Sequence, residues 1–149
     1  MTIENGRAEA VVRDFVDVYV ALRDEVLAWC TRQIAPVDTL KDFLRLVWAG
    51  TAPASAVGEN AEYSVHGRIG CQLRSPAGAE VDIDLKDDRE TFDLWRLRRY
   101  ERSLGSTPEF SDEVLRAACE RLVARRELDA VRPGWYALPG SESADPADA

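Results

Sequence analysis

Three polar residues in the middle of the chain carry side chains that can do chemistry: His66, Asp82 and Asp84. The two aspartates stand two residues apart in a run that alternates polar with apolar residues, so in a strand their side chains point the same way. Carboxylates beside a histidine could bind a divalent metal or act as general acid and base. One interpretation is therefore an enzyme, a hydrolase or a metal-dependent one, with its catalytic site at these three residues.

Cys71 is a further candidate for catalysis, as a nucleophile near His66. The spacing of the two residues puts their side chains on opposite faces of an unbroken strand, although a bulge at Gly67 or Gly70 could reverse that. No serine lies in a nucleophile elbow, and no glycine-rich loop precedes a helix in the way that phosphate-binding loops do. We therefore expect binding rather than catalysis, and the sequence predicts neither a cofactor nor a bound metal.

Acidic residues gather on the outward positions of the predicted strands, and an arginine-rich helix follows them. Arginine is always charged and pairs with carboxylates through a planar fork. Two interpretations stay open: structural ion pairs that hold the helix against the sheet, or a charged surface for a partner. The predicted partner-binding residues are Glu62, Glu80, Asp82, Asp84, Arg96 and Arg99.

The overall charge favours a protein partner. The chain has 149 residues, a net charge of −8 and a pI near 4.7. A nucleic acid or an anionic membrane calls for a basic surface, so neither is an expected partner. Acidity suits capture of a basic protein. The hypothesis is a small acidic protein-binding module that neutralises a basic partner such as a toxin; the oligomeric state is not predicted.

The start of the chain and its cysteines point to the cytoplasm. Residues 1–10 lack the basic segment and apolar run of a signal peptide, and no apolar stretch is long enough to cross a membrane. The three cysteines, Cys30, Cys71 and Cys119, are far apart and form no CxxC motif. Free thiols of this kind are typical of a reducing compartment.

Alternation predicts a three-stranded antiparallel meander over residues 61–67, 68–74 and 80–86. The second and third strands turn apolar side chains to one side and polar ones to the other, which is the pattern of a half-buried strand. Between these two strands, Pro76 presets φ and Gly78 tolerates a positive φ, so residues 75–78 form a turn.

Helical periodicity predicts four helices around this meander. Two precede it: one over residues 8–34, after a loose terminus, and one capped by Asp38 or Thr39. The third begins at Asp87-Asp88 and has an apolar face that includes Phe92, Trp95 and Leu104, with Trp95 in the core. Ser111 caps the fourth, and Pro133-Gly134 forms the turn of a last hairpin. The predicted fold is a single α+β domain, residues 1–139, with a disordered acidic tail at 140–149.

The helix and hairpin at 109–138 allow one more interpretation, a winged-helix-like DNA-binding regulator. In that case a group of arginines would contact phosphates: Arg121, Arg125, Arg126 and Arg132. Acidic residues in the same segment balance these charges, however, and phosphate neutralisation dominates affinity for DNA.

The central motifs resemble an uncharacterised bacterial protein family. Its pattern runs HGxGC, then VDFDF, then GFDxWRL, and the similar residues here are His66-Gly67, Gly70-Cys71, Val81-Asp82-Ile83-Asp84 and Phe92-Asp93-Leu94-Trp95-Arg96-Leu97. The chain departs from the pattern at Arg68-Ile69, Ile83, Leu85 and Thr91. The resemblance implies a shared domain but no activity. In size and acidity the chain is also similar to the small immunity proteins of bacterial contact-dependent toxin systems, which implies a protein partner.

Overall fold

A computed structural model of the protein describes residues 3–105 and 107–139. These residues form one antiparallel sheet of seven strands, in the order β1-β2-β3-β4-β5-β7-β6, and four helices. The strands are β1 (Ser55–Val57), β2 (Glu62–His66), β3 (Gly70–Arg74), β4 (Glu80–Lys86), β5 (Arg89–Asp93), β6 (Asp129–Arg132) and β7 (Trp135–Ala137). The helices are α1 (Ile3–Gln33), α2 (Leu40–Trp48), α3 (Leu94–Ser103) and α4 (Asp112–Ala124).

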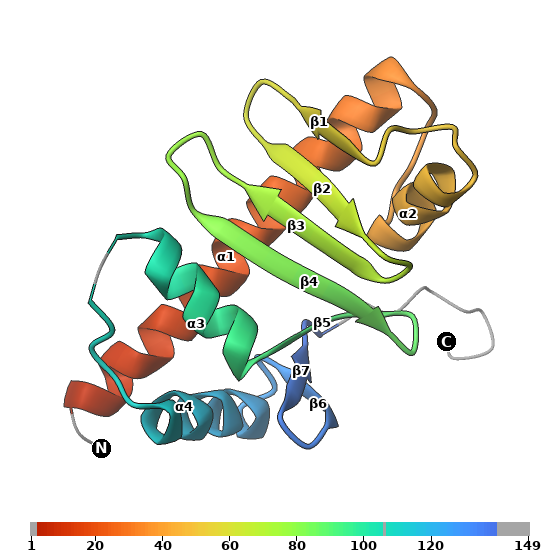
Figure 1. Ribbon diagram of the computed structural model, residues 1–149. Coiled ribbons are helices and arrows are strands. Elements are labelled where there is room, and N and C mark those ends of the chain that lie inside the picture. Colours follow the sequence, from red (N-terminus) through yellow and green to blue (C-terminus); the bar gives the residue numbers. More distant parts are fainter. Residues whose placement is uncertain (1–2, 106, 140–149) are drawn as a thin grey trace.

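Helix α1 runs the length of the molecule and covers one face of the sheet (Figure 1). We call this the inner face. At one end of the core the Phe15 ring of α1 lies 4.7 Å from Phe92 and 5.5 Å from Tyr100. At the other end Tyr63 meets Trp29 of α1 and Phe43 of α2. The two aromatic groups therefore anchor α1 at both ends of the sheet.

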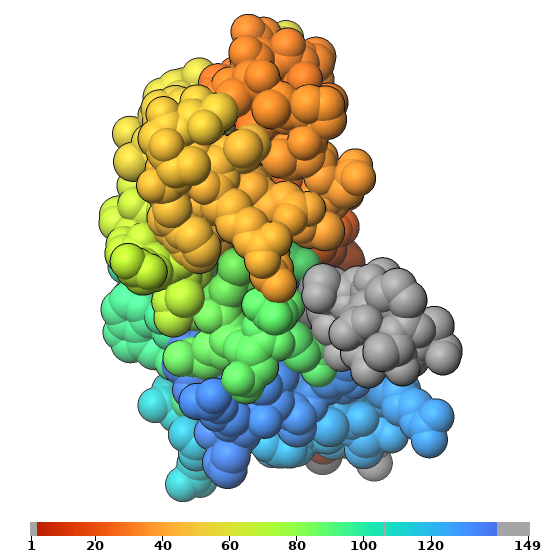
Figure 2. Space-filling model, turned by 90° about the vertical axis from the view of Figure 1, so that its right-hand side faces the viewer, coloured from red at the N-terminus to blue at the C-terminus, as the bar shows by residue number. Residues whose placement is uncertain are grey.

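The smaller elements close the two ends of the core. Helix α4 packs beside α1, and α3 lies alongside β4 (Figure 1). Viewed at right angles, the C-terminal hairpin (blue) packs against the end of the central strands (green), while α2 and the segment after it (orange to yellow) lie at the opposite end (Figure 2). No helix in the described part of the chain is long and apolar enough to cross a membrane.

The predicted α+β class is confirmed, but strands are more numerous than predicted. The turn at 75–78 forms as expected, with Gly78 at φ 98°. Thr39 and Ser111 cap α2 and α4 by accepting hydrogen bonds from backbone N–H groups. The meander is extended by β1 on one side and by β5 on the other, and neither strand was predicted. The predicted acidic tail, residues 140–149, lies outside the described residues.

The predicted start of the third helix at Asp87-Asp88 is wrong. Both residues have positive φ, 54° and 63°, and form the tight turn between β4 and β5. Aspartate tolerates the left-handed region, and hairpin turns of two residues require it. Phe92 is consequently a strand residue on the inner face. The helix begins seven residues later, where Asp93 caps it by accepting from the Arg96 N–H.

The prediction that Trp95 belongs to the core is also wrong. Its exposed fraction is 52%, and Leu104 at the end of the same helix is exposed as well. Helix α3 buries Leu97 and Tyr100, which lie on one side of it. Trp95 stands two residues before Leu97, about 200° around the helix axis, so it faces away from the core.

The N-terminus also differs from the prediction of a loose segment over residues 1–7. Helix α1 begins at Ile3, and Arg7 already pairs with Glu109 across the fold. The prediction failed because the periodic apolar face begins only at Ala8, whereas a helix can extend past its buried stripe.

Candidate functional site: the outer face of the sheet

Strand β4 separates apolar from acidic side chains. Val81, Ile83 and Leu85 are buried against the inner face. The intervening Asp82 and Asp84 point to the other side, the outer face, where each side chain is 15% exposed. The alternation in the sequence thus produces two faces of opposite character, as predicted.

Arginines of α3 meet these carboxylates directly. Arg96 Nη2 donates to Asp84 Oδ2 at 2.8 Å, and its Nη1 donates to Asp93 Oδ1 at 3.0 Å. Arg99 Nη1 lies 3.3 Å from Asp82 Oδ2. Both arginines therefore hold α3 against the outer side of β4.

Glu80 extends the same cluster toward the start of β4. It pairs with Arg99 at 3.4 Å and with Arg74 of β3 at 2.6 Å, and its backbone N–H donates to Ser103 Oγ of α3 at 2.8 Å. We refer to the whole cluster as the outer-face network. Its members are Arg74, Glu80, Asp82, Asp84, Asp93, Arg96 and Arg99.

The structure thus brings together most of the predicted site residues. Glu62 of β2 stands on the same face, opposite Arg74 in the strand register, and forms no ion pair among the described residues. His66 lies exposed at the end of β2, opposite Gly70. Gly70 in turn stands opposite Asp84, which brings His66 to the edge of the outer-face network.

A cavity of about 140 Å³ lies at the centre of this arrangement. We call it the Gly70 cavity after the glycine among the residues that line it. A Cβ atom there would lie 2.9 Å from the His66 carbonyl oxygen and 3.5 Å from Asp84 Oδ1. Any other residue would therefore require the backbone to shift. The residues that line the cavity include His66, Gly70, Asp82, Asp84 and Arg96.

Two buried polar atoms of the cavity-lining residues have no hydrogen-bond partner among the described residues: Asp82 Oδ1 and Arg96 Nε. The first is an acceptor and the second is a donor. Burial raises the pKa of Asp82 above its ordinary value, although the nearby Arg99 and Arg96 act in the opposite direction. Unpaired buried polar atoms are uncommon in folded proteins and call for an explanation.

Two tryptophans, Trp95 and Trp135, lie against Arg96, which lines the cavity. The Arg96 guanidinium lies 5.5 Å from the Trp95 ring centroid and 4.8 Å from that of Trp135. Arg99 lies 5.6 Å from Trp95, and Lys86 Nζ lies 4.3 Å from Trp135. Cations thus flank both indoles at distances that permit cation–π attraction.

Sequence reasoning missed Gly70, Trp135 and Lys86 as site residues. In the sequence, Gly70 stands out only as a possible bulge and as part of the family motif. Trp135 reaches the site because β7 pairs with β5, where Trp135 stands opposite Asp93. Nothing in the spacing of the sequence indicates that pairing.

The alternative of a Cys71–His66 pair does not fit the geometry. The two strands pair without a register shift, so Cys71 shares the inner side with Val65 while His66 stands on the outer side. Cys71 is buried, and burial raises its pKa to about 12. The thiolate, which is the nucleophilic form, is therefore scarce at neutral pH.

The metal-site alternative finds no ligand set in the described part of the chain. No three His, Cys, Asp or Glu side chains there are placed so that they could hold a metal ion. The carboxyl groups of Asp82 and Asp84 are turned instead to Arg99 and Arg96.

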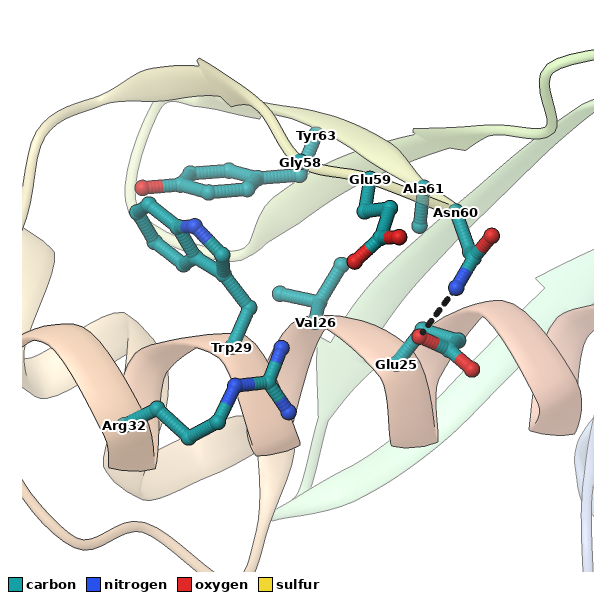
Figure 3. A pocket seen from close by; sticks show the side chains of 9 residues that line it. All are labelled: Glu25, Val26, Trp29, Arg32, Gly58, Glu59, Asn60, Ala61 and Tyr63. Atoms are coloured by element: carbon teal, nitrogen blue, oxygen red, sulfur yellow. Dashed lines mark hydrogen bonds between the residues drawn. The ribbon is translucent and has the colours of Figure 1, made fainter.

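A depression between α1 and the turn from β1 to β2 is too small for a ligand (Figure 3). The Trp29 and Tyr63 rings meet on one side of it, and Asn60 Nδ2 donates to Glu25 at 3.4 Å on the other. Its volume is about 10 Å³, no more than a single water molecule needs.

Three of the four arginines of the winged-helix alternative, which spans residues 109–138, make contacts within the protein. Arg121 and Arg125 both pair with Glu9 of α1, which is buried, and Arg132 pairs with Asp87 at 3.2 Å. The terminal hairpin continues the main sheet through β7 and β5 instead of standing apart as a wing.

Comparison with known proteins yields one match. The model of a protein family described as "Domain of unknown function (DUF6896)" matches residues 7–137. No curated protein and no solved structure matches the chain.

Proposed function

The chain belongs to this family of unknown function, and we propose that it is a binding module for another protein, whose contact surface is the outer face of the sheet together with α3. The observation that carries the proposal is Trp95. This large aromatic side chain is 52% exposed and stands between Arg96 and Arg99, of which Arg96 lines the Gly70 cavity.

The chemistry of this surface suits protein recognition. Tryptophan and arginine are the residues most enriched among those that dominate binding energy at interfaces. The side chain of Arg96 is held by two carboxylates, so little conformational entropy remains to be lost on binding. A rigid aromatic anchor next to a polar cavity gives a partner both apolar area and a specific polar contact.

The ion pairs and the binding role support each other. The outer-face network fastens α3 to β4 and thereby keeps Trp95 in place. The predicted partner-binding carboxylates Asp82 and Asp84 then act mainly by positioning the arginines, while Trp95 makes the apolar contact. This combines the two interpretations that the sequence left open.

The proposed partner is basic, because the chain carries a net charge of −8. Within the outer-face network the charges nearly balance, with four carboxylates against three arginines. The acidity therefore acts at long range, where it speeds encounter with a basic protein. An inhibitor that neutralises a basic toxin would use such a surface, and the proposal includes that immunity-like role.

The test compares two exposed tryptophans. Trp48 of α2 is 45% exposed but lies outside the outer face, so Trp48→Ala is a matched control for Trp95→Ala. Tagged wild-type protein and both variants are incubated with lysate of the source cells at low and at moderate salt. The proposal expects one stoichiometric basic protein that wild type and Trp48→Ala retain and Trp95→Ala loses, with less of it captured at moderate salt.

Two results count against the proposal. If the two variants lose the captured protein equally, the interaction does not depend on the outer face. If a well-folded wild-type protein captures no stoichiometric partner, the module has no protein ligand under these conditions and the binding role is rejected.

A further inference from the structure

A second hollow of the surface lies between α1, the C-terminal end of α3 and residues 107–110, which follow α3 in the chain (Figure 1). We call it the α1–α3 cleft; its volume is about 170 Å³. We infer that this cleft receives a lysine side chain of the bound protein. The inference rests on the proposed function, which supplies a basic partner, and it adds the residue that this partner inserts.

The walls of the cleft are largely apolar. They include Val11 of α1, Tyr100 and Leu104 at the end of α3, and Phe110 before α4. Leu104 is 48% exposed, so part of this apolar wall is open to a partner. Pockets for whole small molecules usually span about 300–1,000 Å³. A cleft of this smaller size suits a single side chain with an aliphatic stem.

The charged residues that line the cleft are all acidic: Asp14, Glu101 and Glu109. Nearby arginines neutralise them only in part. Arg7 pairs with Glu109, and Arg98 pairs with Glu101, but Arg98 also pairs with Asp112. Four carboxylates therefore stand against two guanidinium groups, which leaves an excess of two negative charges at this place among the described residues.

Asp14 is the lining carboxylate that has no cation beside it. It forms no ion pair among the described residues, and its Oδ2 accepts a hydrogen bond from the hydroxyl group of Tyr100. Tyr100 is buried, so this hydrogen bond fixes the carboxylate against the wall of the cleft. A cationic group of the partner would be the counter-ion that Asp14 lacks.

The arrangement of the acceptors favours an ammonium over a guanidinium group. An ammonium is a compact charge whose three donors point in different directions, whereas a guanidinium pairs best with both oxygens of one carboxylate. Asp14 and Glu101 come from two different helices, and one oxygen of Asp14 already accepts from Tyr100. The C-terminal end of α3 is also the negative end of its helix dipole, which favours a cation. A lysine would lay its stem on the apolar walls and place its ammonium at the carboxylates.

The first arm of the experiment uses the wild-type protein and four small probes: n-butylammonium, n-propylguanidinium, 1-butanol and butyrate. The first two are the side chains of lysine and arginine, and the others replace the cation by a neutral or an anionic group. NMR follows the methyl groups of Val11 and Leu104, with the methyl groups of Val57, exposed on β1, as reference. We expect saturable shifts with n-butylammonium at the cleft signals alone, and at least fivefold weaker binding of the other three probes.

The second arm compares two aspartates of α1. Asp14→Asn removes the unpaired charge, and the new amide oxygen can still accept from Tyr100. Asp17→Asn is the matched control, because Asp17 is also exposed on α1 but does not line the cleft. We expect Asp14→Asn to weaken n-butylammonium binding about fivefold, the equivalent of about 1 kcal/mol, and to reduce capture of the partner. Asp17→Asn should stay within about twofold of wild type, and melting curves check that both variants are folded.

The outcomes separate the inference from the proposed function. Tighter binding of n-propylguanidinium than of n-butylammonium, equal responses to the charged and neutral probes, equal affinities of the two variants, or no saturable shift at the cleft overturns the inference. Capture that survives Asp14→Asn but is lost in Trp95→Ala overturns it as well and leaves the proposed function in place. Capture of no partner at all refutes the proposed function instead, and the NMR arm then still decides whether the cleft accepts an ammonium.

Discussion

The two aspartates of β4 should respond differently to the same substitution. Asp84 and Asp82 lie on one strand and one face, and each side chain is 15% exposed. Their partners differ. Arg96 meets Asp84 at 2.8 Å and is itself 16% exposed, whereas Arg99 lies 3.3 Å from Asp82 and is 38% exposed. Asp84→Asn and Asp82→Asn therefore compare a well-formed, partly buried ion pair with a weaker one.

The loss expected for Asp84→Asn follows from its burial. Removing one partner of a fully buried pair costs about 3–5 kcal/mol, and an exposed pair contributes about 0.2–1 kcal/mol. The Asp84–Arg96 pair is partly buried and lies between these limits. In Asp84→Asn, the amide oxygen of the new side chain can still accept a hydrogen bond from Arg96. We expect a loss of about 1–2 kcal/mol in the free energy of unfolding, which for a chain of this size lowers Tm by about 2–8 °C.

Asp82→Asn should cost little or should stabilise the protein at pH 7. Burial raises the pKa of Asp82, and its Oδ1 has no partner among the described residues. A carboxyl whose pKa is higher in the folded state than in the unfolded state binds more protons when folded, so stability falls as pH rises from the unfolded pKa, about 3.9, through the folded one. At neutral pH the charge is therefore a cost, and the amide removes it.

Thermal and urea unfolding at pH 7 and at pH 4 measure both effects, with Glu62→Gln as control because Glu62 shares the face and forms no ion pair among the described residues. This control should change stability by less than about 0.5 kcal/mol. The difference between wild type and Asp82→Asn should shrink at pH 4, where wild-type Asp82 is more protonated. Equal losses for the two variants at pH 7, or a larger loss for Asp82→Asn, would refute the reasoning.

Three further predictions concern stability and reactivity. Trp95→Ala should lower the free energy of unfolding by less than about 1 kcal/mol, since exposed cation–π contacts contribute little. Phe92→Ala in the core should lower it by about 3–5 kcal/mol, and comparable losses for the two variants in urea unfolding would contradict the assigned exposures. Burial raises the pKa of Cys71 and of Cys119 to about 12, so a thiol reagent should label them only at the rate of unfolding, and rapid labelling of folded protein would contradict this. Glu9→Gln should lower the free energy of unfolding by about 1–3 kcal/mol, because the buried carboxylate accepts a hydrogen bond from Arg125 and forms an ion pair with Arg121; unchanged melting would show that this ion-pair cluster adds no stability.

Local physics accounts for the features that sequence reasoning predicted correctly. The alternation in residues 80–86 follows from the two-residue period of a strand, and it determined which side chains of β4 are buried. The Ser111 and Thr39 caps follow from the unpaired N–H groups at a helix start. Each of these features depends only on neighbours in the chain.

The error at the start of the third helix arose where two local signals compete. Asp87-Asp88 suits a helix start, but the same residues also tolerate the positive φ of a hairpin turn. The hairpin turn forms because it lets β5 pair with both β4 and β7. The backbone groups of β5 are then hydrogen-bonded on both sides. That choice also moved the start of α3, and with it the direction in which Trp95 points.

The sequence by itself determined that β4 has an apolar and an acidic face and that an arginine-rich helix follows. Only the tertiary structure decided that Arg96 and Arg99 reach Asp84 and Asp82, that Trp135 arrives from a distant strand, and that a cavity lies beside Gly70. The physical reason is that side-chain period is encoded locally, whereas contacts between strands and helices depend on the register and packing of the whole sheet.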